Sequence, residues 1–199
     1  MLAHNIHSTR VNNAIGAAKL YFVLDAGGNP IEVSYRPEGS TQTDCYYFVQ
    51  NLQGDVVALV DSADGDTVVT YTYDAWGNVL SVGGELKDTL GKQNPFRYRG
   101  YVYDSETKLY YLQSRYYDPE MGRFINADVY VSTGQGILGN NMFAYCLNRP
   151  VSCADSDGRR TYVINGIGND NEDEAPKNIQ KFRDALEEAG VSDVHTIPV

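Results

Sequence analysis

The chain has 199 residues, of which 42% are hydrophobic and 21% charged, and this composition is typical of a folded protein rather than a disordered or collagen-like one. Its 16 basic and 26 acidic residues give a net charge of −10, which argues against a sequence-independent grip on nucleic acid or anionic lipid. No apolar run approaches the roughly 20 residues of a transmembrane helix, so no membrane span is expected. The 16 Tyr and 19 Gly favour many short strands joined by tight turns.

The N-terminal segment, residues 1–19, lacks the basic start, apolar core and cleavage site of a secretory signal peptide. The three cysteines, Cys45, Cys146 and Cys153, leave an odd one out and show no CxxC spacing. We therefore expect small buried thiols, with neither a disulfide framework nor a zinc site, and we expect no metal and no cofactor.

A short motif with the pattern [DN]-x-x-G-[ND]-x-apolar recurs three times, at residues 25–31, 51–57 and 74–80. Each copy follows a strand-like run and leads into another. An Asp or Asn side chain caps the start of a turn, and Gly tolerates the left-handed backbone needed to reverse the chain. The motif predicts hairpin turns centred on Gly28, Gly54 and Gly77, and similar chemistry predicts one at Gly122.

Residues 61–66 carry three aspartates around one glycine and are interpreted as a further hairpin turn. The alternative is a calcium-binding loop, since carboxylates at such spacing can bind Ca²⁺. The bidentate Glu of a calcium loop is absent at the proper distance, which favours the turn.

The most specific sequence lies in residues 97–124, which contain RYRGYVYDSETKLYY and then RYYDPEMGRF. An Asn-Asn pair and NRPVSCADSDG follow, ending at Gly158. This text resembles the RHS repeat-associated core of the RHS or YD-repeat proteins, over roughly residues 20–158. Lys108 stands where that family usually has Gly, which suggests a turn without a positive backbone angle.

The resemblance implies a mainly β fold: an antiparallel YD-repeat β-hairpin strip, forming part of an RHS shell, followed by a truncated α/β segment. The implied organisation is an N-terminal segment (1–19), YD-type repeats (20–96), the RHS-associated core (97–158) and the start of a truncated C-terminal effector domain (159–199). Seven tyrosines in residues 98–117 would form ladders across neighbouring strands.

Four arginines are interleaved with the tyrosines of this region, a pattern that could also bind RNA by stacking and charge. Because acidic residues lie among them, we expect cross-strand ion pairs instead. The arginines are Arg97, Arg99, Arg115 and Arg123, and the acids are Asp104, Glu106, Asp118 and Glu120.

In members of the resembled family the end of the core cleaves its own backbone with aspartates, in the manner of aspartic proteases, just after D-x-x-G. The matching positions are Asp128 and Asp155, the candidate catalytic residues. Val129 and Arg159 depart from the cleaving pattern, so we expect both aspartates to act as turn caps. A self-cleaving aspartyl protease core remains the alternative.

After Arg160 the sequence predicts a strand over 161–167, a helix that starts at Pro176 and a second apolar run over 194–199. Asn165 and Gly166 weakly resemble the oxyanion loop that follows the first strand of α/β-hydrolases. No G-x-S-x-G occurs in the chain, so an α/β-hydrolase effector fragment would lack its nucleophile.

The leading hypothesis is therefore a fragment of a secreted or cell wall-associated polymorphic toxin, whose β-shell encapsulates and delivers a C-terminal effector. The resemblance implies the chain's own effector domain as partner, together with an immunity protein and secretion machinery. A carbohydrate-binding or adhesion surface is the alternative from another class, because exposed Tyr and Trp76 could stack on sugars.

Overall fold

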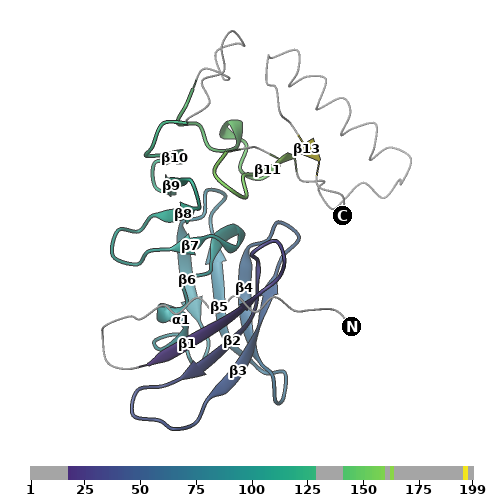
Figure 1. Ribbon diagram of the computed structural model, residues 1–199, viewed down its shortest axis with the longest axis vertical. Helices are drawn as coiled ribbons and strands as arrows, with labels where there is room; N and C mark the ends of the chain where they lie inside the picture. Colours follow the sequence, from purple (N-terminus) through teal and green to yellow (C-terminus); the bar gives the residue numbers. More distant parts are fainter. Residues whose placement is uncertain (1–17, 129–140, 160–161, 164–194, 197–199) are drawn as a thin grey trace, which may run out of the picture. The chain divides into compact units, whose positions relative to one another are not determined.

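The computed structural model describes residues 18–128, 141–159, 162–163 and 195–196 (Figure 1). The chain divides into two compact units. The first holds the residues up to Asp74 together with Val79–Gly100, and the second holds Ala75–Asn78 together with the residues from Tyr101 on. The mainly antiparallel β architecture expected from the sequence is confirmed.

The first unit is a six-stranded antiparallel sheet whose strands follow chain order (Figure 1). In β5, Val69 and Tyr71 are buried while Thr70 and Thr72 are exposed, so the sheet has one apolar face. The strands are β1 (Lys19–Leu24), β2 (Pro30–Arg36), β3 (Asp44–Gln50), β4 (Val56–Asp61), β5 (Thr67–Tyr73) and β6 (Val79–Gly83).

The apolar face of this sheet packs against the segment that contains the one-turn helix α1 (Leu90–Gln93) and the 3-10 turn η1 (Tyr98–Gly100). Phe96 from this segment meets Phe22 edge-on, with ring centroids 5.0 Å apart. The Tyr71 hydroxyl donates to the Gly91 carbonyl at 2.8 Å, which ties the segment to β5. Aromatic pairs of this kind stabilise by about 0.5–1.5 kcal/mol beyond their area burial.

The repeated motif forms the same hydrogen-bonded turn at each site where its contacts are described. Asn51 Oδ1 accepts the N–H groups of Gln53 and Asp55, each at 2.9 Å, and its Nδ2 donates to the Asp55 carboxylate. The glycines adopt positive φ, 87° at Gly28, 86° at Gly54 and 93° at Gly77. A register shift interrupts the ladder just before each of these turns, in β1, β3 and β5. The sequence repeat is thus a repeat of one bulged turn.

The acidic segment 61–66 is also a turn. The Asp61 N–H donates to the Asp66 carbonyl at 2.8 Å, which closes the hairpin between β4 and β5. Asp61 Oδ1 accepts the Ala63 N–H, and Asp64 Oδ1 accepts the Asp66 N–H. These carboxylates cap backbone donors, as the turn interpretation requires.

The second unit contains a four-stranded antiparallel sheet in the order β10-β9-β8-β7. Its strands are β7 (Val102–Tyr103), β8 (Tyr110–Leu112), β9 (Arg115–Asp118) and β10 (Arg123–Phe124). The 3-10 turn η2 (Cys146–Asn148) then leads to β11 (Cys153–Ala154), which pairs antiparallel with β12 (Tyr162–Val163). β12 pairs parallel with β13 (His195–Thr196). The helix expected from Pro176 lies outside the described residues.

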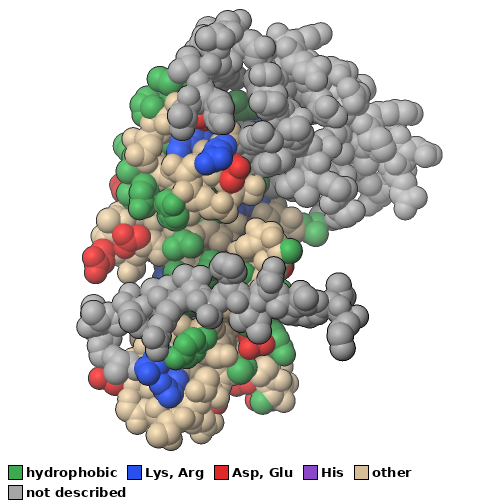
Figure 2. All heavy atoms as spheres, in the orientation of Figure 1, with side chains coloured by type: hydrophobic (Ala, Val, Ile, Leu, Met, Phe, Trp, Pro, Cys, Tyr) green, Lys and Arg blue, Asp and Glu red, His purple; other side chains and the backbone are tan. Residues whose placement is uncertain are grey.

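Tyrosines form the expected ladders on both faces of the four-stranded sheet. Tyr110 and Tyr117 are opposite one another and buried, with ring centroids 6.3 Å apart. Tyr111 and Tyr116 form a pair at 5.1 Å on the other face, where both are exposed. Elsewhere, on the face drawn in Figure 2, hydrophobic side chains lie in small groups among polar and charged ones.

The expectation for Lys108 is wrong, because this residue has a φ of 61°. The turn between β7 and β8 closes through a bond from the Lys108 N–H to the Asp104 carbonyl at 2.8 Å, and another from the Asp104 N–H to the Leu109 carbonyl. Such a turn requires left-handed backbone at this position whatever the residue. Lys108 is exposed, so its long side chain meets no obstacle and only the backbone is strained.

The tip of the β5–β6 hairpin, residues 75–78, packs on the four-stranded sheet as part of the second unit. The Tyr117 hydroxyl donates to the Trp76 carbonyl at 2.7 Å, and the Tyr110 hydroxyl donates to the Gly77 carbonyl at 2.8 Å. The Trp76 ring lies over Gly122, where a Cβ atom would come within 2.9 Å of it. Trp76 is half-buried and packs against the sheet, which disfavours it as an open platform for sugars.

Candidate functional site: the Arg115 anchor

Arg115 lies at the start of β9 and contacts four residues from three separate segments of the second unit. Its Nη1 is 3.0 Å from Asp128 Oδ2, and its Nη2 is 3.3 Å from Asp155 Oδ2. Nη1 also donates to the Met142 carbonyl at 3.2 Å, and Nε donates to the Gly158 carbonyl. The arginine side chain is only 6% exposed. A planar fork with several donors suits such a hub, because each N–H meets a different acceptor.

Within the segment from Asp155 to Arg159, the peptide bond between Gly158 and Arg159 is contacted at both of its polar groups, the carbonyl and the N–H. The Ser114 hydroxyl lies 2.8 Å from the Gly158 carbonyl and 2.7 Å from the Asp157 carbonyl, and can donate to either. On the other side of the bond, the Arg159 N–H lies 3.0 Å from both Asp155 Oδ1 and Asp157 Oδ1. The Gly158–Arg159 link is therefore fixed at its carbonyl and at its N–H.

Position 158 requires glycine for two reasons, its backbone conformation and the lack of room for a side chain. Its φ is 71°, in the left-handed region. A Cβ atom there would lie 2.7 Å from the Leu112 carbonyl oxygen and 2.7 Å from Ser114 Oγ. Any side chain would push the segment away from the turn between β8 and β9.

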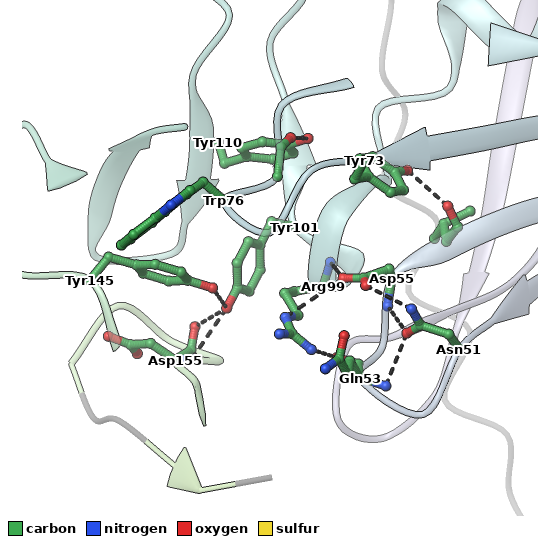
Figure 3. Close-up of polar contacts among 12 residues, drawn as sticks. Asn51, Gln53, Asp55, Tyr73, Trp76, Arg99, Tyr101, Tyr110, Tyr145 and Asp155 are labelled. Carbon is green, nitrogen blue, oxygen red and sulfur yellow. Dashed lines mark hydrogen bonds and ion pairs between the residues drawn. The ribbon is translucent and has the colours of Figure 1, made fainter. Parts of the chain in front are cut away.

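Asp155 is also held through its backbone by Tyr101, a buried tyrosine whose hydroxyl lies against that of buried Tyr145 (Figure 3). The Tyr101 hydroxyl donates to the Asp155 carbonyl at 2.6 Å and accepts the Asp155 N–H at 3.3 Å. Tyr145 places its hydroxyl 3.1 Å from that of Tyr101. Burial raises the pKa of Tyr101 well above its usual value of 10.0, so the hydroxyl keeps its proton and remains a donor.

Both sequence-predicted aspartates, Asp128 and Asp155, meet at this one arginine. Each carboxylate is ion-paired with a different nitrogen of the guanidinium. Aspartic-protease chemistry uses two carboxyls that share one proton. Asp155 also uses its second oxygen to accept the Arg159 N–H. Both aspartates are thus ion-pair partners of the same arginine.

The expectation that the interleaved arginines pair with the neighbouring acids is wrong. Asp104 Oδ1 accepts the Glu106 N–H at 2.9 Å and Asp118 Oδ1 accepts the Glu120 N–H at 2.9 Å, so these carboxylates cap turns. Hydrogen bonds from the Glu106 N–H and the Thr107 side chain lower the pKa of Asp104. The reason is proximity, since a turn N–H two residues away is within reach at little entropic cost. Instead, Arg115 pairs with Asp128 and Asp155, Arg99 pairs with Asp55, and Arg97 donates to the carbonyls of Gly91, Lys92 and Asn94.

Arg99 forms a second buried cluster, in the first unit (Figure 3). Its N–H donates to Asp55 Oδ1 at 3.0 Å, and its Nη1 donates to the Gln53 carbonyl at 2.8 Å. Asp55 belongs to the second copy of the repeated motif and also accepts from Asn51. This cluster fastens a repeat turn to the segment after α1, and it is structural.

Sequence reasoning found the two aspartates but missed Ser114 and Tyr101 as their supporting groups. Arg115 was visible only as one of four similar arginines. Nothing in its local sequence distinguishes it from Arg123, which is exposed.

The oxyanion-loop candidates Asn165 and Gly166 lie outside the described residues. In the described ranges, no group of three or more His, Cys, Asp and Glu residues could hold a metal ion.

A strip of antiparallel hairpins built on a repeated bulged turn, with a Tyr-rich core that anchors a C-terminal segment, defines a YD-repeat shell protein. The model of the Teneurin YD-shell family matches residues 16–146. The chain belongs to this family.

Relatives of the chain include toxins. It is 42% identical over 163 residues to the tRNA3(Ser)-specific nuclease WapA of Bacillus spizizenii, covering 82% of this chain and 6% of that protein. It is 33% identical over 113 residues to the double-stranded DNA deaminase toxin A of Burkholderia cenocepacia, covering 57% of this chain and 7% of that protein. The crystal structure of TcdB2-TccC3 superposes with a TM-score of 0.59 at 26% identity, covering 74% of this chain and 7% of that one. The chain thus spans a small part of each relative.

No helix in the described ranges is long and apolar enough to cross a membrane.

Proposed function

We propose that this chain is the closing section of a YD-type β-shell in a polymorphic toxin, and that the Arg115 anchor fixes the point where the chain leaves the shell wall. The shell encloses the effector region that continues after Arg159 and delivers it to a target cell. The toxin is secreted or attached to the cell surface, and its other partners are an immunity protein and secretion machinery. In this role Asp128 and Asp155 hold the exit in place and do not cut it.

The observation that carries the proposal is the fixed Gly158–Arg159 link. Its carbonyl accepts hydrogen bonds from Ser114 and Arg115, and its N–H faces the Asp155 carboxylate. A linker that served only to join two domains would need none of these contacts. The family and its toxin relatives supply the rest of the argument, because WapA and the deaminase toxin share this section and carry named toxic or nuclease activities.

Limited trypsin digestion of the full-length protein, followed with an antibody to a C-terminal tag, tests enclosure. If the shell encloses the effector, the tagged region stays intact for as long as the shell does, and it becomes sensitive when the shell is unfolded in urea. Digestion of the tagged region at the rate of the separately expressed effector would show that it lies outside the shell.

Arg115→Ala and Arg123→Ala form a matched pair for the anchor in the same experiment. Arg123 is exposed and makes no ion pair in the described chain, so its loss should leave protection unchanged. Loss of Arg115 should expose the region around Arg159 to trypsin first. Equal protection in both variants would contradict an anchoring role for Arg115.

A further inference from the structure

The segment after β11 is contacted at two points that lie three residues apart. At the first, one hydroxyl, that of Tyr101, binds both the N–H and the carbonyl of Asp155. At the second, Ser114 and Arg115 both reach the Gly158 carbonyl. Contact with both backbone groups of one residue fixes the register, because a shift by one residue would break both bonds together.

The two contacted residues are selected by type as well as by position. The Asp155 carboxylate accepts from Arg115 on one oxygen and from the Arg159 N–H on the other, which a neutral side chain would not match. Gly158 has no room for a Cβ and has a positive φ. Between them, Ser156 is exposed. The pattern recognised is therefore Asp-x-x-Gly.

We propose that Tyr101, Ser114 and Arg115 form a peptide-binding site for an Asp-x-x-Gly segment, and that this site holds residues 155–158 even when the chain is cut before them. The inference rests on the proposed function and adds to it a non-covalent lock. Such a lock would keep the exit closed after the chain has been nicked. Its polar contacts are buried, with Asp155 1% and Tyr101 6% exposed, so water competes poorly for them.

The turn at Val151 allows the lock to be tested in the complete chain, because Val151 is 59% exposed and precedes both contact points. A tobacco etch virus protease site is inserted between Val151 and Ser152, and near-UV circular dichroism of the uncut protein confirms that the fold is retained. After cutting, size-exclusion chromatography measures whether the fragment that begins near Ser152 stays with the rest. We expect co-elution, and immediate loss of the fragment from the otherwise unaltered protein would overturn the proposal.

Peptide competition tests the pattern itself. A synthetic peptide with the sequence of residues 153–159 should displace the nicked fragment, and the same peptide carrying the Gly158→Ala change should be at least tenfold weaker. Equal displacement by both peptides would contradict recognition of glycine. These measurements do not depend on where the effector lies, so they can fail while the protease protection of the full-length protein succeeds, and the reverse.

Variants in the nicked protein complete the test. Tyr101→Phe removes both bonds to Asp155, Ser114→Ala removes a donor to Gly158, and Lys108→Ala is a matched exposed control. The fragment should dissociate at least tenfold faster in the first two variants and at an unchanged rate in the third. Unchanged dissociation in Tyr101→Phe and Ser114→Ala would show that other packing, and not this site, retains the fragment.

Discussion

The guanidinium carbon of Arg115 lies 3.6 Å from the centroid of the Phe124 ring, so the cation that pairs with Asp128 and Asp155 is stacked on an aromatic face. The ring comes from β10, the strand next to the arginine's own strand β9. It covers one side of the guanidinium while the N–H groups at its rim meet their acceptors. This cation–π contact helps to explain how the charged Arg115 side chain can be buried.

Arg115→Lys should destabilise the second unit by about 3 kcal/mol, because a lysine cannot span two carboxylates and two carbonyls, and the aspartates would keep only part of their pairing. Native-state hydrogen exchange of the β8 and β9 amides measures the loss, and the amides of β3 and β4 serve as an internal reference in the other unit. Arg123→Lys should change neither set. A loss below about 0.5 kcal/mol in β8 and β9 would show that the ion pairs contribute little.

Gly158→Ala should lower stability by more than a glycine-to-alanine change at a turn with open space. Gly65 is the matched control, since its φ is 82° and nothing lies within 4 Å of its Cβ position. Both variants place alanine in left-handed backbone, which costs about 1–2 kcal/mol. Only in Gly158→Ala does the new Cβ also clash with the Leu112 carbonyl oxygen and Ser114 Oγ. Urea unfolding should place the Gly158→Ala loss at least 1 kcal/mol above that of Gly65→Ala. Equal losses would mean that the segment adapts freely.

Lys108→Gly should stabilise the chain by up to about 1 kcal/mol, because it relieves a positive φ at an exposed position. Lys108→Ala keeps the strained backbone and should bring no gain. Thermal unfolding of the two variants beside the parent protein distinguishes them. If the alanine variant gains as much as the glycine variant, the lysine side chain and not its backbone is the source of the strain.

Tyr101→Phe should change how stability depends on alkaline pH. The folded-state pKa of Tyr101 is raised, so its contribution is complete below the unfolded value of 10.0 and is lost as pH rises toward the folded value. Above pH 10 the parent protein should lose about 1.4 kcal/mol per pH unit more than the variant. Urea unfolding at several values between pH 8 and pH 11.5 gives both slopes, and parallel slopes would show that the hydroxyl titrates normally in the folded state.

The sequence predicted local features of the fold well, because the repeated Asx-to-Gly turns carry their own chemistry. Turns of this kind are set by residues four apart, as Asn51 and Asp55 illustrate. The same locality explains the two errors. Lys108 adopts a glycine conformation because the surrounding hairpin dictates it, and Asp104 caps its own turn before any arginine can reach it.

The candidate site was predictable only in part, because its contacts join residues far apart in the chain. Asp128 and Asp155 were recognised from motif positions, yet their common partner lies 13 residues before one and 40 before the other. Tyr101 is one of seven tyrosines in its region, and only its separation of 54 residues from Asp155, closed by the fold, reveals its role. Long-range polar contacts leave no periodic signal in the sequence.

The proposed function requires that the Arg115 anchor holds residues 155–159 and that Asp128 and Asp155 leave the chain uncut. Intact-mass spectrometry of the purified chain, followed over days at neutral and mildly acidic pH, tests this most directly. We expect one species with the mass of the uncut chain, both for the parent and for Asp155→Asn. A fragment of residues 159–199 that accumulates in the parent and is absent in Asp155→Asn would contradict the anchoring role and assign Asp155 to self-cleavage.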